Sequence, residues 1–106
     1  MARQKLVTAS MKIPRLGSQD NNPDPMVVAK LFNPCGSGSW YVIEYDGRDI
    51  FFGFVDLGDP ACAELGTFSR LELETLALPF GMHVERDVFW RPKPLSEVVR
   101  MVKAQV

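Results

Sequence analysis

The fold is decided by the stretch SWYVIEYDGRDIFFGFVDL (residues 39–57), which predicts two β-strands joined by a tight turn. Asp46 and Gly47 both tolerate positive φ, so they favour a two-residue hairpin loop. This loop would set Trp40 opposite Gly53, where the large indole covers a residue that has no side chain. A three-residue loop is the alternative, and it would shift every pairing by one position.

Both faces of this hairpin are apolar. Alternation along each strand places Tyr41, Ile43, Ile50, Phe52 and Phe54 on one face, and Trp40, Val42, Phe51, Val55 and Leu57 on the other. The two-residue loop would also place the like charges of Glu44 and Asp49 opposite each other. An antiparallel sheet with two apolar faces needs a cover on each of them.

The flanking sequence predicts three further extended segments. Runs typical of strands occupy residues 25–34, 63–69 and 82–92. Near the start of the chain, Thr8 is placed to cap a short helix that Pro14 would end.

Two helix starts are also visible. Ser69 and Glu72 match a capping box, and Phe68 and Leu73 match the hydrophobic staple of the same helix. A closing helix lies within residues 94–106, because apolar residues recur there at helical spacing. Its apolar stripe consists of Leu95, Val98, Val99, Val102 and Val106.

These elements predict a single α+β domain over the whole chain of 106 residues. We expect an antiparallel sheet of four or five strands, with short helices packed mainly on one face. Such helices supply too few residues to cover both faces. The second face is covered either by residues 1–22 or by a second copy or a partner protein, and the sequence leaves both alternatives open.

The composition argues against a membrane protein, a secreted protein and a nucleic-acid-binding protein. No run of about 18 apolar residues could span a membrane, and the start of the chain lacks a secretory signal, so we expect a cytoplasmic protein. Cys35 and Cys62 lack CxxC spacing and histidine partners, which favours free thiols. Residues 1–22 hold four basic side chains and one acidic side chain. Residues 23–76 hold three basic and nine acidic side chains, and residues 77–106 hold five basic and three acidic side chains. The overall basic balance of a nucleic-acid binder is missing.

One cluster has residue types that could carry chemistry. His83, Glu85 and Asp87 alternate along an extended segment, so they would share one side and could bind a divalent metal. A solvated sheet edge is the simpler interpretation, and we expect no metal and no cofactor. An enzyme would need these three side chains and Glu44 as its acid–base set, but no hydrolase motif accompanies them.

Two neighbouring features have structural and binding interpretations. Arg86 would point away from the acidic cluster and is expected to pair with Glu64 or Glu72. The segment FWRPKP, residues 89–94, mixes aromatic and basic side chains, as surfaces that bind single-stranded nucleic acid do.

The order of motifs resembles the domain-of-unknown-function family 2958. The motifs are DPMVVAKLFNP, SWYVIEYDG, IFFGFVDL, ELGTFSRLELE, the ERD of HVERDVFW, and KPLSEV, and together they span residues 24–98. The family pattern includes the residues matching Trp40, Glu44, Phe52, Gly53, Glu64, Gly66, Ser69, Glu72, Glu85, Arg86 and Asp87. Residues 1–22 depart from the family's opening helix, and His83 is not part of the pattern.

The resemblance implies a small bacterial protein of plasmids and integrative conjugative elements, with no known reaction. We therefore expect a non-catalytic accessory module that acts by protein contact, with a protein partner or a second copy. The expected binding residues are Trp40, Val42, Glu44, Phe51, Val55, Glu85, Arg86 and Asp87. On this expectation Phe51→Glu would disrupt association and spare the fold. A small metal- or acid–base-dependent enzyme and a nucleic-acid-binding or DNA-mimicking protein are the alternatives.

Overall fold

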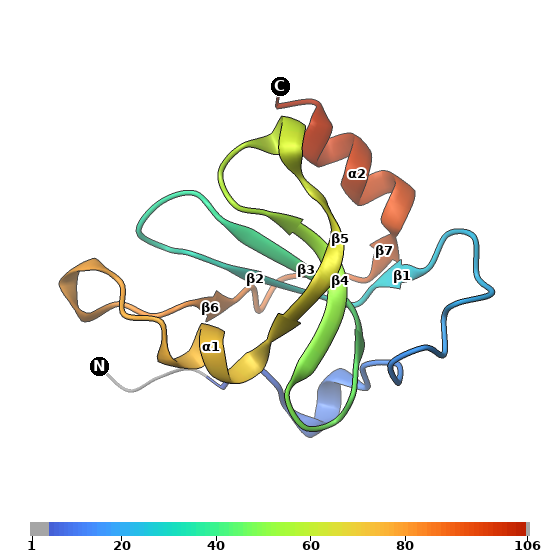
Figure 1. Cartoon of the computed structure of the whole chain (residues 1–106), viewed down its shortest axis with the longest axis horizontal. Helices are drawn as coiled ribbons and strands as arrows, with labels where there is room; N and C mark the ends of the chain where they lie inside the picture. The colour runs from blue at the N-terminus through green and yellow to red at the C-terminus, as the bar shows by residue number, and fades with distance from the viewer. Residues whose placement is uncertain (1–4, 106) are drawn as a thin grey trace.

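A computed structural model describes residues 5–105 as an α+β fold, as the sequence predicts (Figure 1). The main sheet is antiparallel, with five strands in the order β5-β4-β3-β2-β6. These strands are β2 (Ala29–Phe32), β3 (Ser39–Tyr45), β4 (Ile50–Asp56), β5 (Glu64–Ser69) and β6 (Glu85–Arg86). A second, two-stranded sheet pairs β1 (Met26–Val27) with β7 (Lys93–Pro94). The helices are α1 (Arg70–Thr75) and α2 (Leu95–Lys103), with 3₁₀ turns η1 (Ala9–Met11), η2 (Pro60–Cys62) and η3 (Pro79–Gly81).

The predicted hairpin is present, but its register is not the predicted one. Trp40 pairs with Val55, and Gly53 pairs with Val42. Along most of β3 the pairing is displaced by two positions from the two-residue-loop prediction. Because side chains alternate with a period of two, this displacement leaves Trp40, Tyr41 and Val42 on their predicted faces. An irregularity between Val42 and Glu44 shifts the pairing by one further position, and Tyr45 beyond it packs on the face of Trp40.

The turn of the hairpin explains the different register. One carboxylate oxygen of Asp46 accepts hydrogen bonds from the amides of Arg48, Asp49 and Ile50, at 2.7, 2.8 and 3.1 Å. The Asp46 amide in turn donates to the carbonyl of Ile50 at 2.9 Å. A side chain that satisfies three amides favours this longer loop over both predicted ones. The predicted opposition of Glu44 and Asp49 is therefore wrong.

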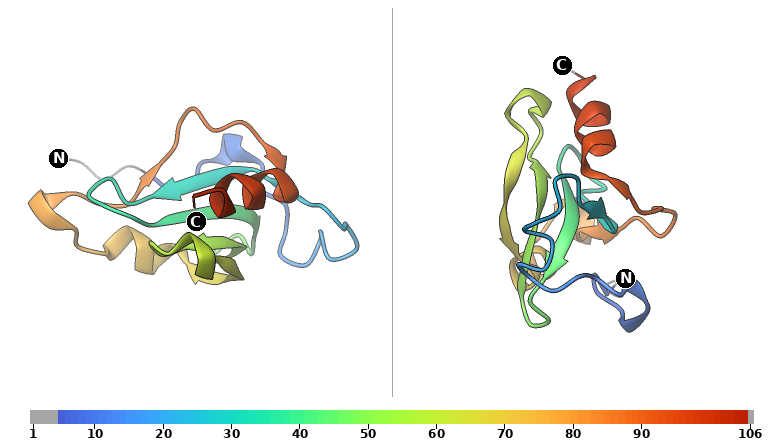
Figure 2. Two further views of the ribbon diagram at one scale, coloured as in Figure 1. Left: turned by 90° about the horizontal axis from the view of Figure 1, so that it is seen from above. Right: turned by 90° about the vertical axis from the view of Figure 1, so that its right-hand side faces the viewer.

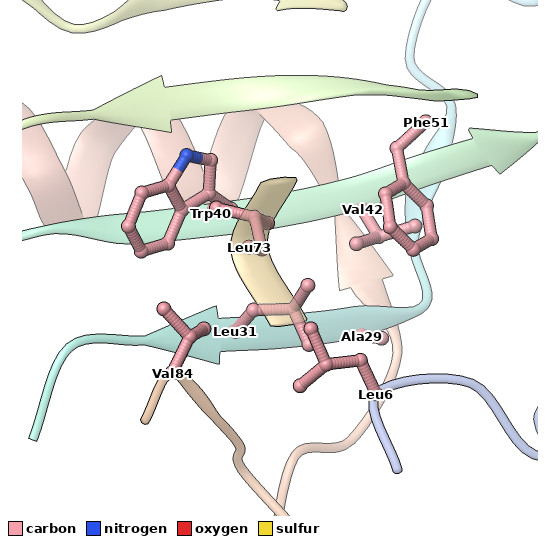
Figure 3. Packing of buried hydrophobic residues seen from close by; sticks show 8 residues of the cluster. All are labelled: Leu6, Ala29, Leu31, Trp40, Val42, Phe51, Leu73 and Val84. Atoms are coloured by element: carbon pink, nitrogen blue, oxygen red, sulfur yellow. The ribbon is translucent and has the colours of Figure 1, made fainter. Parts of the chain in front are cut away.

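Two buried clusters lie on opposite faces of the sheet. The α1-side cluster consists of Leu6, Ala29, Leu31, Trp40, Val42, Phe51, Leu73 and Val84 (Figure 3). The α2-side cluster consists of Val27, Tyr41, Ile43, Phe54, Ala63, Val98 and Val102. The two helices thus serve different faces, and the expectation of helices mainly on one face is wrong in this detail. Of the predicted face residues, Leu57 is exposed and Ile50 belongs to neither cluster.

The chain itself covers the face that the sequence left open. Leu6, from the N-terminal segment, belongs to the same buried cluster as Leu73 of α1 and lies next to Leu31 of β2 (Figure 3). Met11 and Ile13 pack against the same cluster. Of the two alternatives, the structure supports the one in which residues 1–22 fold back, although residues 1–4 lie outside the described part.

The start of α1 is capped twice. The Ser69 hydroxyl accepts the Glu72 amide at 3.1 Å, which is half of the predicted capping box. Asp49 of the hairpin loop adds a second cap, because its carboxylate accepts the Leu71 amide at 2.8 Å and the Ser69 hydroxyl at 2.7 Å. The hairpin turn and α1 are therefore held together by side chains that are distant in sequence.

The closing helix α2 is the predicted one, and Val98 and Val102 are its buried residues. The predicted stripe also included Val106, which lies outside the described residues. Asp24 caps this helix from a distance, because its carboxylate accepts the Ser96 amide at 2.8 Å and the Ser96 hydroxyl at 2.7 Å. Among residues 5–105, no helix is long and apolar enough to cross a membrane.

These caps predict a specific loss of stability in acid. The hydrogen bonds accepted by Asp24, Asp46 and Asp49 lower the pKa of each carboxyl below its ordinary value. The stabilisation is complete above the unfolded pKa of about 3.9 and is lost as the pH falls through the lower folded values. We expect a Tm that is constant from pH 7 to 5 and falls below about pH 4. Asp49→Asn should reduce the difference in Tm between pH 7 and pH 3, and an unchanged difference would contradict this origin.

Candidate functional site

The predicted apolar binding face is core. Trp40 is 7% exposed and Phe51 is 0% exposed, and Val42 is equally buried. Val55 is half-buried and packs against the same cluster. The expectation that these four residues present an apolar patch in the isolated chain is wrong, because the N-terminal segment and α1 cover it.

Glu44 is a buried carboxylate with a structural role. It lies opposite Phe52, next to an irregularity in the pairing of β3 with β4. Its two oxygens accept the amides of Gly17 and Gln19, at 2.9 and 2.7 Å. Charge-assisted bonds to backbone amides are the strong kind, so Glu44 fixes the loop that follows the N-terminal segment.

The ERD motif lies at one edge of the sheet. Arg86 pairs with Leu31 of β2, and its guanidinium donates to the carbonyl of Lys5 at 2.7 Å. Glu64 belongs to β5, at the opposite edge of the sheet, so the predicted Arg86–Glu64 pair is wrong. The arginine instead holds the N-terminal segment against the sheet edge.

The acid–base set proposed for an enzyme is not brought together. Glu85 is level with Phe32 of β2 and with Ser39 of β3, whereas Glu44 lies five positions further along β3. At about 3.3 Å per residue this separates the backbone positions of the two residues by roughly 16 Å along the strand direction. Within residues 5–105, no three His, Cys, Asp or Glu side chains are arranged to hold a metal ion. The ring nitrogen Nδ1 of His83 is buried, and among the described residues it has no hydrogen-bond partner.

The aromatic and basic segment after β6 is mostly built into the fold. The Trp90 indole donates to the carbonyl of Val27 at 3.0 Å and lies 5.7 Å from the Tyr41 ring. The Lys93 ammonium sits 4.4 Å from the centre of the Trp90 ring. The Trp90 ring is thus in contact through its nitrogen and its face, whereas Phe89, at 88% exposure, Arg91 and Pro92 are exposed.

A polar cleft of about 280 Å³ lies beside the glycine-rich turn after β2. Lys30, Tyr41 and Asp56 line it, and the Lys30 ammonium lies 5.7 Å from the centre of the Tyr41 ring. Burial raises the pKa of Tyr41 above its ordinary value, so this hydroxyl stays protonated at neutral pH. The cleft offers hydrogen bonds and one cation, but Tyr41 cannot serve it as a base.

Both cysteines carry free, exposed thiols, and their environments differ. The Cys62 thiol donates to a carboxylate oxygen of Asp59 at 3.2 Å, and this hydrogen bond and the nearby charge raise the pKa of Cys62. We expect titration of the denatured, non-reduced protein to find two thiols. In the native protein Asp59→Asn should accelerate the reaction of Cys62 with a disulfide reagent several-fold at pH 7.5, because more thiolate forms. An unchanged rate would contradict the role of Asp59.

The most exposed aromatic side chain sits on a tight turn of residues 78–82, here called the Phe80 turn. Phe80 is 97% exposed, and its backbone is left-handed, at φ 60° and ψ 26°. Gly81 also has positive φ, at 71°, and the Met82 amide donates to the Pro79 carbonyl at 3.2 Å. Two consecutive left-handed residues closed by such a bond form a type I′ turn, a geometry that favours Asn, Asp or Gly.

The segment that leads into this turn is apolar and exposed. Leu76, Ala77 and Pro79, which precede Phe80 along the chain, are exposed. Helix α1, before this segment, carries Glu72 and Glu74, and its one arginine, Arg70, is paired with Glu74 at 2.8 Å. Figure 1 shows the connection between α1 and β6 extending away from the sheet, at the left of the view. The turn therefore presents an unpacked aromatic ring at an end of the molecule.

Sequence reasoning missed this turn. Pro79 and Gly81 are signals that stop a helix, and no predicted site includes them. A proline and a glycine flanking a phenylalanine also indicate a tight turn with an apolar residue at its tip, and that pattern could have identified the site.

Comparison with known proteins identifies the family. The family model described as "Protein of unknown function (DUF2958)" matches residues 2–105. The match includes the N-terminal segment, beyond the motifs of residues 24–98. No curated protein and no solved structure matches the chain significantly. Since the family model covers nearly the whole sequence, the chain belongs to the DUF2958 family of proteins of unknown function.

Proposed function

We propose that this protein is a non-catalytic accessory module of a bacterial mobile genetic element and acts in the cytoplasm by binding another protein through the Phe80 turn. The setting rests on the resemblance of the sequence motifs to proteins of plasmids and integrative conjugative elements. The mode of action rests on one observation, an almost fully exposed phenylalanine held in a left-handed backbone conformation.

The argument for binding begins with the cost of Phe80 to the fold. A left-handed conformation costs a residue with a side chain about 1–2 kcal/mol. The ring recovers none of this by packing, because it is 97% exposed. Backbone strain that nothing in the fold repays points to a functional role, and exposed aromatic rings are frequent centres of protein interfaces.

The chemistry of the turn favours one kind of partner. Nucleic acids and anionic membranes are bound through basic side chains, and the one arginine of α1, the helix before the turn, is paired with Glu74. A protein with an apolar pocket matches the exposed ring. We therefore propose a protein partner of that chemistry.

The first test is the stability of Phe80→Asn. Asparagine tolerates the left-handed conformation that a type I′ turn requires, and it removes no buried contact. A relief of about 1 kcal/mol corresponds to a rise in Tm of roughly 4–8 °C in a domain of this size. Thermal unfolding should show an equal or higher Tm than wild type, and a fall of several degrees would mean that the ring stabilises the fold.

The second test is capture of the partner from the native host. Immobilised wild-type protein and the Phe89→Asn variant should retain the same partner, because Phe89 is an exposed phenylalanine on a different loop. Phe80→Asn should lose it. Rebinding of the purified partner, identified by mass spectrometry, should show the same order of affinities. Equal retention by all three proteins would refute the assignment to Phe80.

A further inference from the structure

The polar cleft beside the glycine-rich turn lies at the end of the sheet where three segments of the chain meet. Its lining comes from the turn between β2 and β3, the connection between β4 and β5, and Gln105 beyond α2. In the right-hand view of Figure 2, the turn between β2 and β3 lies between that connection and the end of α2. The volume of about 280 Å³ is just below the range of about 300–1,000 Å³ that is typical of ligand pockets, so the cleft suits a small molecule.

The register of the sheet places charged side chains of both signs at this cleft. Phe32, Ser39 and Asp56 form one row across β2, β3 and β4, and Lys30 and Tyr41 belong to the next row on the same face. Since β3 lies between β2 and β4, the backbones that carry Lys30 and Asp56 are about 10 Å apart. The two charged side chains line one cleft, and in the part of the chain that the structure describes they form no ion pair with each other.

Asp56 is the buried anion of the cleft. It is 9% exposed, and one of its carboxylate oxygens accepts the Gly58 amide at 3.0 Å. Among residues 5–105 this is the only hydrogen bond of the carboxylate, and no cation pairs with it. A carboxylate that is removed from water without a positive partner costs free energy. A ligand with an ammonium group would supply that partner.

Lys30 is the cation of the cleft, and aromatic rings hold it. Its ammonium lies 6.0 Å from the centre of the Phe32 ring and 5.7 Å from the centre of the Tyr41 ring. Such rings attract an ammonium group but do not neutralise its charge. Within the described residues no carboxylate pairs with Lys30, so its charge is free to bind a carboxylate of a ligand.

We propose that this cleft binds a small zwitterion of the α-amino-acid class, with its carboxylate on Lys30 and its ammonium on Asp56. The two opposite charges disfavour simple ions, because a ligand with one charge is attracted by one of these side chains and repelled by the other. The hydroxyls of Ser37 and Ser39 line the cleft and offer further hydrogen bonds. The small volume favours a free amino acid over a peptide. This inference does not rest on the Phe80 turn, because the cleft and the turn share no residue.

Nuclear magnetic resonance titrations with each standard L-amino acid test the proposal. At least one amino acid should shift the signals of the residues that line the cleft, with a millimolar or lower Kd. Its N-acetyl derivative, which lacks the ammonium, should bind at least tenfold more weakly. Its amide, which lacks the carboxylate, should show the same loss. Phe80→Asn should bind this amino acid like wild type, which separates this site from the proposed partner site.

Two variants test the two charges separately. Asp56→Asn should weaken binding of the amino acid at least tenfold and should not weaken binding of the N-acetyl derivative, which has no ammonium to pair. Lys30→Gln should weaken binding of the amino acid to the same extent and should not weaken binding of the amide. Lys93→Gln is the control, because the Lys93 ammonium lies 4.4 Å from the centre of the Trp90 ring and neither residue lines the cleft.

The derivatives also guard against misfolding of a variant, because a misfolded protein loses every ligand and not one of them. Wild-type protein that binds no amino acid at millimolar concentration would overturn the proposal. Equal affinities for the amino acid and its two derivatives would do so too. A folded Asp56→Asn or Lys30→Gln variant that binds the amino acid as tightly as Lys93→Gln would also contradict it.

Discussion

Phe51→Glu is expected to unfold the protein. Phe51 is completely buried between the rings of Tyr45 and Phe68, with ring centres 4.7 and 5.2 Å away. The change removes a large apolar side chain and leaves a carboxylate among apolar residues, and either effect alone costs about 3 kcal/mol or more. The free energy of unfolding of a domain of this size is only about 5–15 kcal/mol, so the two losses together are expected to unfold the protein.

Circular dichroism and urea unfolding measure this effect. Phe89→Glu is the matched control, because Phe89 is an exposed phenylalanine and its replacement should change the free energy of unfolding by less than about 0.5 kcal/mol. A folded Phe51→Glu protein with a near-native Tm would show that the face is open. It would restore the expectation that a partner covers Trp40 and Phe51.

Gly53→Ala is expected to have the second-largest effect. The added methyl group would lie 1.9 Å from the Tyr41 carbonyl oxygen, a backbone atom of the neighbouring strand. Strands β3 and β4 would have to separate at their buried centre, at a cost of about 3 kcal/mol. The Tm should fall by more than about 10 °C.

Gly66→Ala is the control for this prediction. It adds the same methyl group to the adjacent strand, directly opposite Gly53 in the register, where nothing lies within 4 Å. Its Tm should be equal to or higher than that of wild type. Similar losses in the two variants would mean that backbone flexibility, and not the contact with Tyr41, sets the effect.

The hairpin shows how far the sequence determines this fold. Alternation placed Trp40 and Phe51 on one face correctly despite the wrong register. It does not hold past the irregularity between Val42 and Glu44, where Tyr45 packs on the face of Trp40. The register depends on the side chain of Asp46, which accepts three amides, and this local choice is not visible in the apolar pattern. A short sequence signal therefore predicted the topology but not the pairing.

The cover of the sheet was harder to predict. The apolar residues Leu6, Met11 and Ile13 have neither helical nor strand spacing, so no pattern marked them as core. They are placed by contacts from distant residues, such as the bond from Arg86 to the Lys5 carbonyl. The prediction of an exposed apolar binding face was wrong for the same reason, because the N-terminal segment that covers this face has no periodic apolar pattern.

The sequence does not show that the Phe80 side chain is exposed, and the candidate site depends on that exposure. A phenylalanine beside proline and glycine is as compatible with a buried turn as with an exposed one, and only the fold shows that Phe80 is unpacked. The ERD motif and Glu44 were predicted to be binding residues. Arg86 and Glu44 prove to hold the N-terminal segment and the following loop in place.

The most direct test of the proposed function is site-specific photo-crosslinking in the native host. A benzophenone derivative of phenylalanine at position 80 keeps an aromatic ring at the tip of the turn, and the same substitution at position 89 is the control. We predict one distinct crosslinked protein from position 80 that is absent from position 89. The absence of any crosslink at position 80, or the same products from both positions, would contradict the claim that the Phe80 turn contacts a partner.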